Sequence, residues 1–159
     1  MQKKVSALLL GIASFGTGFF LGGKQLVKMI NDYKMRMERN QLNMMVFNNW
    51  LDYIYAGGSL EHYFHNRGYK EIIIYGNGYI GTRLMQALQG TDIKIAAVMD
   101  KENSSAANEI MINCDAEIPE ADCIVITPVF YDKEIRAALQ KRTEVPIISV
   151  NEIWQENRT

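Results

Sequence analysis

Three glycines at the spacing Gly-x-Gly-x-x-Gly are the residues of this 159-residue chain whose pattern most suggests chemistry. Gly76, Gly78 and Gly81 come directly after the β-branched run at residues 71–75. In such a turn the first glycine permits a tight exit from a strand, the second lets the backbone approach a phosphate, and the third allows close helix–strand packing. The N–H groups that open the next helix then face the anion. The spacing predicts a phosphate-binding turn.

Asp100 stands at the end of a second apolar strand, predicted at residues 92–100. Strand, glycine turn, helix, strand and acid within about 30 residues form the context that a dinucleotide-binding motif requires. The Asp100 carboxylate is placed to accept hydrogen bonds from ribose hydroxyls. Its charge would repel a 2′-phosphate, which argues against NADP.

The rest of the chain predicts a small α/β domain, a Rossmann-like parallel sheet. Apolar runs indicate further strands and polar periodic runs indicate helices, at residues 109–112 (an edge strand), 121–128 (strand), 131–142 (helix), 145–150 (strand) and 151–157 (helix). Right-handed crossovers would order the five strands 3-2-1-4-5. The ligand crevice would then lie beyond the carboxyl ends of the strands that start at Glu71 and Asp122.

These positions define a predicted cofactor site for NAD or a nucleotide-sugar. Thr127 and Pro128 end the strand beside the glycine turn and join it around the ligand; Val129 and Phe130 fit either the crevice or the core. The predicted site comprises Gly76, Asn77, Gly78, Tyr79, Ile80, Gly81, Asp100, Thr127 and Pro128.

Catalytic and metal-binding groups are not predicted. None of the eight tyrosines has a lysine four residues later, the pair that short-chain reductases use. His62 and His65 lie three residues apart without further ligands nearby in the sequence, so a polar helix face is expected. The sheet also consumes the chain, leaving no second domain for a substrate. An autonomous enzyme is therefore disfavoured.

The N-terminal part of the chain predicts a membrane anchor at residues 1–23. Residues 5–23 carry no charge, and such a helix reaches roughly the 30 Å of a bilayer core. A cleaved signal peptide is the alternative, since Lys3 and Lys4 precede the apolar run. The more basic flank after the span favours a single-pass protein of the cell membrane with its C-terminal domain in the cytoplasm.

Residues 24–56 predict a long amphipathic helix between the anchor and the domain at 57–159. Its apolar positions alternate at spacings of four and three, with one polar member: Leu26, Ile30, Tyr33, Met37, Asn40, Met44, Phe47, Leu51 and Ile54. We call these positions the seam. Two interpretations stay open, a coiled coil between two copies of the chain or packing along the following domain. Gly57 and Gly58 end the helix, and Ser59 is expected to cap a short one.

The stretches GGSLEHYFHNRGYKEIIIYGNGYIGTRL, AAVMD, DCIVITPVFYDKEIRAAL and PIISVNEIW resemble small Rossmann-like domains of bacterial capsule and exopolysaccharide biosynthesis. They are also similar to the nucleotide-binding domains that precede sugar-nucleotide dehydratases and sugar acyltransferases. The resemblance covers residues 57–159 and implies that the three glycines contact phosphate and Asp100 the ribose.

The expected function is that of a membrane-anchored binding or sensor module in cell-surface polysaccharide synthesis. Its expected partners are a nucleotide ligand and either a second copy of the chain or a polysaccharide-synthesis protein. The net charge of −1 argues against nucleic acid. The alternatives are an NAD-dependent, sugar-nucleotide-modifying enzyme component completed by a partner chain, and a structural adaptor with an empty crevice.

Overall fold

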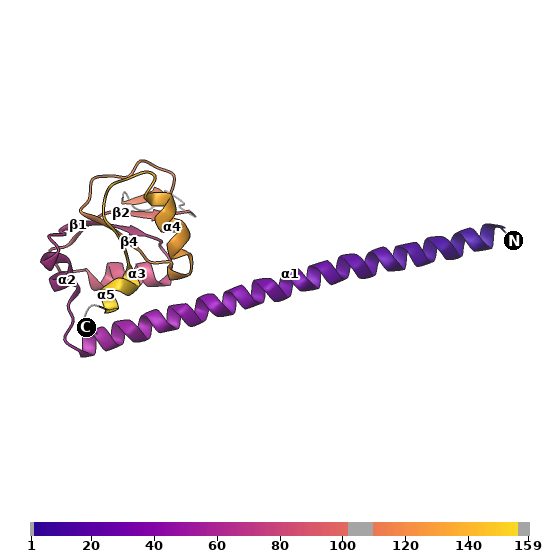
Figure 1. Cartoon of the computed structure of the whole chain (residues 1–159), viewed down its shortest axis with the longest axis horizontal. Coiled ribbons are helices and arrows are strands. Elements are labelled where there is room, and N and C mark those ends of the chain that lie inside the picture. The colour runs from indigo at the N-terminus through magenta and orange to yellow at the C-terminus, as the bar shows by residue number, and fades with distance from the viewer. Residues whose placement is uncertain (1, 102–109, 156–159) are drawn as a thin grey trace. The chain divides into compact units, whose positions relative to one another are not determined.

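A computed structural model of the chain describes residues 2–101 and 110–155, and for residues 2–22 the helical backbone alone. The chain divides into two compact units, Met1–Gln41 and Leu42–Thr159. Figure 1 labels the helices and strands.

The first unit is helical throughout its described residues, as the first part of helix α1, Gln2–Tyr55. Its seam residues Leu26, Ile30, Tyr33 and Met37 are all exposed. The predicted membrane span at residues 5–23 lies almost wholly outside the residues whose side chains are described. Within the described part of the chain, no helix combines the length and the apolar character needed to cross a bilayer.

The second unit is built on a five-stranded sheet in which every pairing is parallel. The strands are β1 Glu71–Tyr75, β2 Lys94–Asp100, β3 Met111–Asn113, β4 Cys123–Ile126 and β5 Ile147–Ser149. Their order, β3-β2-β1-β4-β5, confirms the predicted 3-2-1-4-5 arrangement. Residues in β1 and β4 are buried on both faces, as the continuous β-branched runs predict.

Alternate side chains of the strands enter two separate cores. Ile72 and Ile74 join the core formed with α2 Leu60–Asn66, α3 Tyr79–Ala87, α5 Val150–Gln155 and the end of α1. Ile73 joins the core that Leu139 of α4, Asp132–Leu139, covers on the other face. Helices on both faces of a parallel sheet make this a doubly wound fold.

Two predicted helices differ in their limits. The helix predicted at residues 131–142 begins with a 3-10 turn, Val129–Tyr131, and α4 ends at Leu139. The terminal helix starts one residue early, at Val150, and residues 156–157 lie outside the described part. Ser59 caps α2 as predicted, because its hydroxyl accepts from the His62 N–H at 3.3 Å.

The last turns of α1 belong to the second unit and pack on α5. The rings of Trp50 and Trp154 stack at 4.9 Å between centroids, and the Asn49 amide donates to the Asn151 side chain at 3.0 Å. Val46 and Tyr53 are buried in the same contact. Packing on the domain therefore uses a face at spacings of four and three that is mostly distinct from the seam.

Three of the four seam residues of the second unit remain exposed beside this contact. Met44, Leu51 and Ile54 each expose half or more of their surface, whereas Phe47 is half-buried against the core. Packing along the domain thus accounts for only one of these four positions.

Candidate functional site

The glycine turn begins with a backbone conformation that favours glycine. Gly76 has φ +101°, in the left-handed region, and its N–H donates to the Met99 carbonyl at 2.7 Å. A Cβ on Gly76 would lie 2.7 Å from Cγ of Pro128 and 2.8 Å from the Thr127 hydroxyl oxygen. Both the conformation and the contact space require glycine here.

Gly81 permits the closest approach in the site. A Cβ at this position would lie 1.9 Å from the Gly76 carbonyl oxygen, far inside any van der Waals contact. Helix α3 therefore reaches the carboxyl end of β1 only because residue 81 has no side chain. The requirement is one of packing between helix and strand.

Gly78 differs from the other two glycines. It is the N-cap of α3, and a Cβ there would meet nothing within 4 Å. Gly78 is exposed to solvent, so the space in front of the start of α3 is open.

The start of α3 also lacks the side chains that neutralise the other helix starts of this unit. Ser59 and Glu61 serve α2, and Asp132 and Glu134 occupy the first turn of α4. Helix α3 has no acid in its first turn and no side-chain cap. Because the first N–H groups of a helix have no intrahelical acceptor, this end presents donors that neither the N-cap side chain nor a first-turn acid satisfies.

Asp100 lies beside the turn, as the sequence predicts, and is bonded to the protein. One of its carboxylate oxygens accepts from the Asn77 backbone N–H at 2.6 Å. Asp100 thus ties the carboxyl end of β2 to the turn that follows β1.

Thr127 has a structural position beneath the turn. It is 2% exposed, and its hydroxyl lies 3.0 Å from the carbonyl oxygens of both Tyr75 and Gly76. Pro128 is half-buried against Gly76. These two residues hold the ends of β1 and β4 together under the open space.

The remaining predicted residues divide between surface and core. Tyr79 is exposed, with its ring 4.9 Å from the Phe47 ring and the Arg83 guanidinium 5.4 Å from its ring centroid. Ile80 is buried in the core, so its side chain faces away from the crevice.

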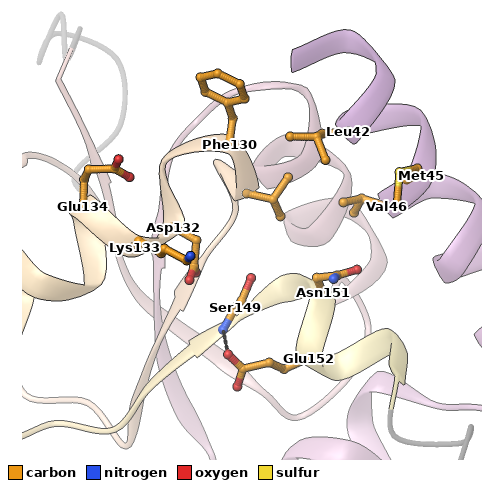
Figure 2. A pocket seen from close by; sticks show the side chains of 11 residues that line it. Leu42, Met45, Val46, Phe130, Asp132, Lys133, Glu134, Ser149, Asn151 and Glu152 are labelled. Carbon is orange, nitrogen blue, oxygen red and sulfur yellow. Dashed lines mark hydrogen bonds between the residues drawn. The ribbon is translucent and has the colours of Figure 1, made fainter. Parts of the chain in front are cut away.

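A cavity of about 530 Å³ was not predicted from the sequence; Val129, which follows Pro128, is one of its lining residues, and no residue of the glycine turn is. Figure 2 shows its apolar side, from α1, facing polar side chains from α4 and the β5–α5 junction. Its lining is Leu42, Met45, Val46, Val129, Phe130, Asp132, Lys133, Glu134, Ser149, Asn151 and Glu152. Of these lining residues, the sequence analysis singled out only Val129 and Phe130, as residues that fit either the ligand crevice or the core.

Buried ionisable groups of the sheet are held in their neutral forms, Tyr75 and Cys114 near the turn and Cys123 at the amino end of β4. Tyr75 and Cys114 share a side-chain hydrogen bond, and burial raises the pKa of both groups. Burial also raises the pKa of the Cys123 thiol to about 12. None of the three is prepared as a base or nucleophile at neutral pH.

One group of exposed side chains has metal-ligand types. Glu61, His65 and Asp92 place their ligand atoms within 4.8 Å of one another. Asp92 precedes the amino end of β2, so this group lies away from the glycine turn. The His65 imidazole and the Asp92 carboxylate lie 2.7 Å apart. This contact is a surface ion pair or hydrogen bond that needs no metal. The spacing of the sequence did not predict that Asp92 lies beside His65.

Comparison with known proteins places part of this chain in a family. Residues 68–153, more than half of the chain, match the family model described as C2185-like, N-terminal. The match covers the whole sheet with α3 and α4 and omits α1. Neither the curated proteins nor the solved structures contain a match to the chain.

Proposed function

This chain belongs to the C2185-like family, and for the site that its matched segment builds we propose the binding of a nucleotide or nucleotide-sugar. The ligand's phosphates would lie at the start of α3, in front of Gly78. The protein would act as a binding or sensor module, with no chemistry of its own.

The observation that carries the proposal is the uncapped start of α3. Its N-cap has no side chain, its first turn has no acid, and the space before it is open. A phosphate there would accept from backbone N–H groups at the positive end of the helix. The other helices that follow α1 carry an acid in their first turn, so an anion is favoured at α3.

An adaptor with an empty crevice is the second candidate, and one contact favours it. The Asp100 carboxylate, expected on a ribose, is bonded to the Asn77 N–H at 2.6 Å. That bond stabilises the turn without any ligand. A ribose hydroxyl would have to share the Asp100 carboxylate with Asn77.

The place of action that we propose rests on the sequence alone. Residues 5–23 carry no charged side chain, and the basic residues beyond them favour a cytoplasmic C-terminal domain. With the resemblance to polysaccharide-synthesis domains, this supports an anchored accessory subunit at the cell membrane. An NAD-dependent enzyme component would differ in showing activity only in a complex with its partner chain.

We also propose that the chain pairs with a second copy through the seam. Leu26, Ile30, Tyr33 and Met37 expose roughly half of their surface or more to solvent. An apolar row with a period of 3.5 residues fits a partner helix of the same period, which a second copy supplies.

The test is thermal unfolding of the full chain with NAD, NADP, coenzyme A and UDP-, CDP- and dTDP-sugars. A ligand at 100 times its dissociation constant should raise Tm on the order of 8 °C. Gly78→Trp, whose Cβ would meet no protein atom within 4 Å, places a bulky ring in front of the helix start and should abolish the shift. Gln89→Trp, exposed beyond the far end of α3, is the matched control and should retain it. No shift with any compound at millimolar concentration would favour the adaptor.

A further inference from the structure

We infer that the 530 Å³ cavity beside the turn receives the sugar half of a nucleotide-sugar, an inference that rests on the proposed nucleotide site. The cavity is assigned to a polyhydroxylated ring of hexose size. A volume of this order is typical of small-molecule sites.

Two pairs of sequence neighbours connect the cavity to the glycine turn. Pro128 contacts the position of Gly76, and the next residue, Val129, lines the cavity. Val46 also lines it, and the next residue, Phe47, has its ring 4.9 Å from that of Tyr79 at the start of α3. A ligand whose phosphates lie at α3 therefore has the cavity as its neighbouring space.

The two sides of the cavity match the two kinds of surface on a sugar ring. Leu42 and Val46 supply an apolar wall for the C–H face (Figure 2), and Val129 and Phe130 also line the cavity. Ser149, Asn151 and Asp132 face it with hydroxyl, amide and carboxylate groups, which bond to sugar hydroxyls. The cavity is more suited to such a ring than to a second phosphate, because three of its four charged residues are acids.

One carboxylate oxygen of Asp132, a residue that lines the cavity, has no hydrogen-bond donor. Oδ1 of Asp132 is buried without a partner, whereas Oδ2 lies 3.5 Å from Nε of Arg136. Buried carboxylate oxygens without a donor are rare in folded proteins. Oδ1 is closed to solvent in this structure, so a sugar hydroxyl would supply this donor once the Asp132 side chain turns toward the cavity.

Glu152 binds the same Arg136 as Asp132 does, and it has an additional bond to the backbone. One Glu152 carboxylate oxygen binds the Arg136 guanidinium and accepts from the Ser149 backbone N–H at 3.2 Å. Glu152 therefore fixes the β5–α5 junction. Its contacts leave Asp132 and the Ser149 hydroxyl as the polar groups that a substitution can probe.

The experiment measures binding of matched pairs to the full chain by calorimetry: UDP with UDP-glucose, CDP with CDP-glucose, and dTDP with dTDP-glucose, with NAD alongside. In the pair that binds, the glucose conjugate should bind about tenfold tighter than the diphosphate, the effect of one or two hydrogen bonds. Asp132→Asn and Ser149→Val should each reduce this ratio toward one and leave diphosphate affinity unchanged. Asp115→Asn, an exposed acid outside the cavity, should leave the ratio intact.

The possible outcomes separate the two proposals. Equal affinity within a binding pair, binding of NAD alone, or a ratio unaffected by both cavity variants would overturn the sugar assignment while the nucleotide site stands. A loss of diphosphate affinity in Asp132→Asn would overturn it too, by placing Asp132 at the phosphates. No binding by any compound would overturn both.

Discussion

At the scale of single residues, the three glycines of the turn have separable roles. Gly76 and Gly81 are required by contacts within the protein, at 2.7 Å and 1.9 Å from a hypothetical Cβ. A Cβ at Gly78 would meet no protein atom within 4 Å, so a side chain there affects mainly what enters from outside. Stability and binding can therefore be tested at different positions of one motif.

Alanine substitutions should separate these roles. Gly81→Ala should lower the free energy of unfolding by about 3 kcal/mol or more, because the Gly76 carbonyl is backbone and cannot rotate away. Gly78→Ala should cost less than about 1 kcal/mol, the range for an N-cap residue. Urea unfolding of both variants measures the difference. Equal losses would contradict the packing described for Gly81.

Asp122, at the amino ends of β1 and β4, should make the stability of the protein depend on pH. Its carboxylate accepts from the Lys70 and Glu71 N–H groups at 2.7 and 2.8 Å, and these bonds hold the pKa of Asp122 below its ordinary value. A lowered pKa contributes stability above the unfolded value of about 3.9, and that stability is lost as pH falls through the folded value.

Asp122→Asn should accordingly lower Tm at neutral pH. The difference from the wild type should shrink as the pH falls below about 4, since the wild-type carboxyl becomes protonated. Thermal unfolding at a series of pH values checks this, with Asp115→Asn as the control. A difference that stays constant down to pH 2 would show that the backbone bonds do not depend on the charge.

At the scale of elements, the sheet followed from the sequence and the cavity did not. Continuous β-branched runs, one glycine turn and the right-handed crossover rule are local or general, and they predict strand order. The cavity is made by residues 42–46, 129–134 and 149–152, which only tertiary packing brings together. The apolar spacing of α1 likewise predicted a seam, whereas docking uses Val46, Trp50 and Tyr53.

The contact between α1 and α5 can be tested at Trp50. Trp50→Ala removes the ring stacked on Trp154 and should lower the free energy of unfolding by about 2 kcal/mol. Leu51→Ala, at the next position, removes a side chain that is 50% exposed and should change it by less than about 0.5 kcal/mol. Denaturant unfolding followed by circular dichroism measures both. Equal effects would contradict the docking of this face.

At the scale of the whole molecule, exposed large apolar side chains gather on one element. Among the described residues, nearly all of them lie on α1: Leu26, Val27, Met29, Ile30, Tyr33, Met35, Met37, Met44, Met45, Leu51, Ile54 and Tyr55. Tyr79 and Tyr131 are the exceptions. An apolar helix surface of this extent indicates an interaction site, and the seam selects the row that a second copy would cover.

Pairing through the seam predicts a position-specific effect of charge. Met37→Glu places a carboxylate in the seam and should shift the full chain from dimer to monomer by at least tenfold in dissociation constant. Met35→Glu is the matched control, because Met35 is similarly exposed (49% against 46%) and lies off the seam. Light scattering across a concentration series measures both. A monomeric wild type, or equal effects of the two variants, would contradict self-association.

The different roles of the three glycines also predict how the motif would change during evolution of the family. A lineage that lost its ligand would still keep Gly76 and Gly81, because substitutions there disturb the fold itself. Position 78 would be released, since a Cβ there meets no protein atom within 4 Å. Retention of the first and third glycines therefore records only the inheritance of the scaffold. Variation at the second, read across members of the family, would date the loss of binding branch by branch.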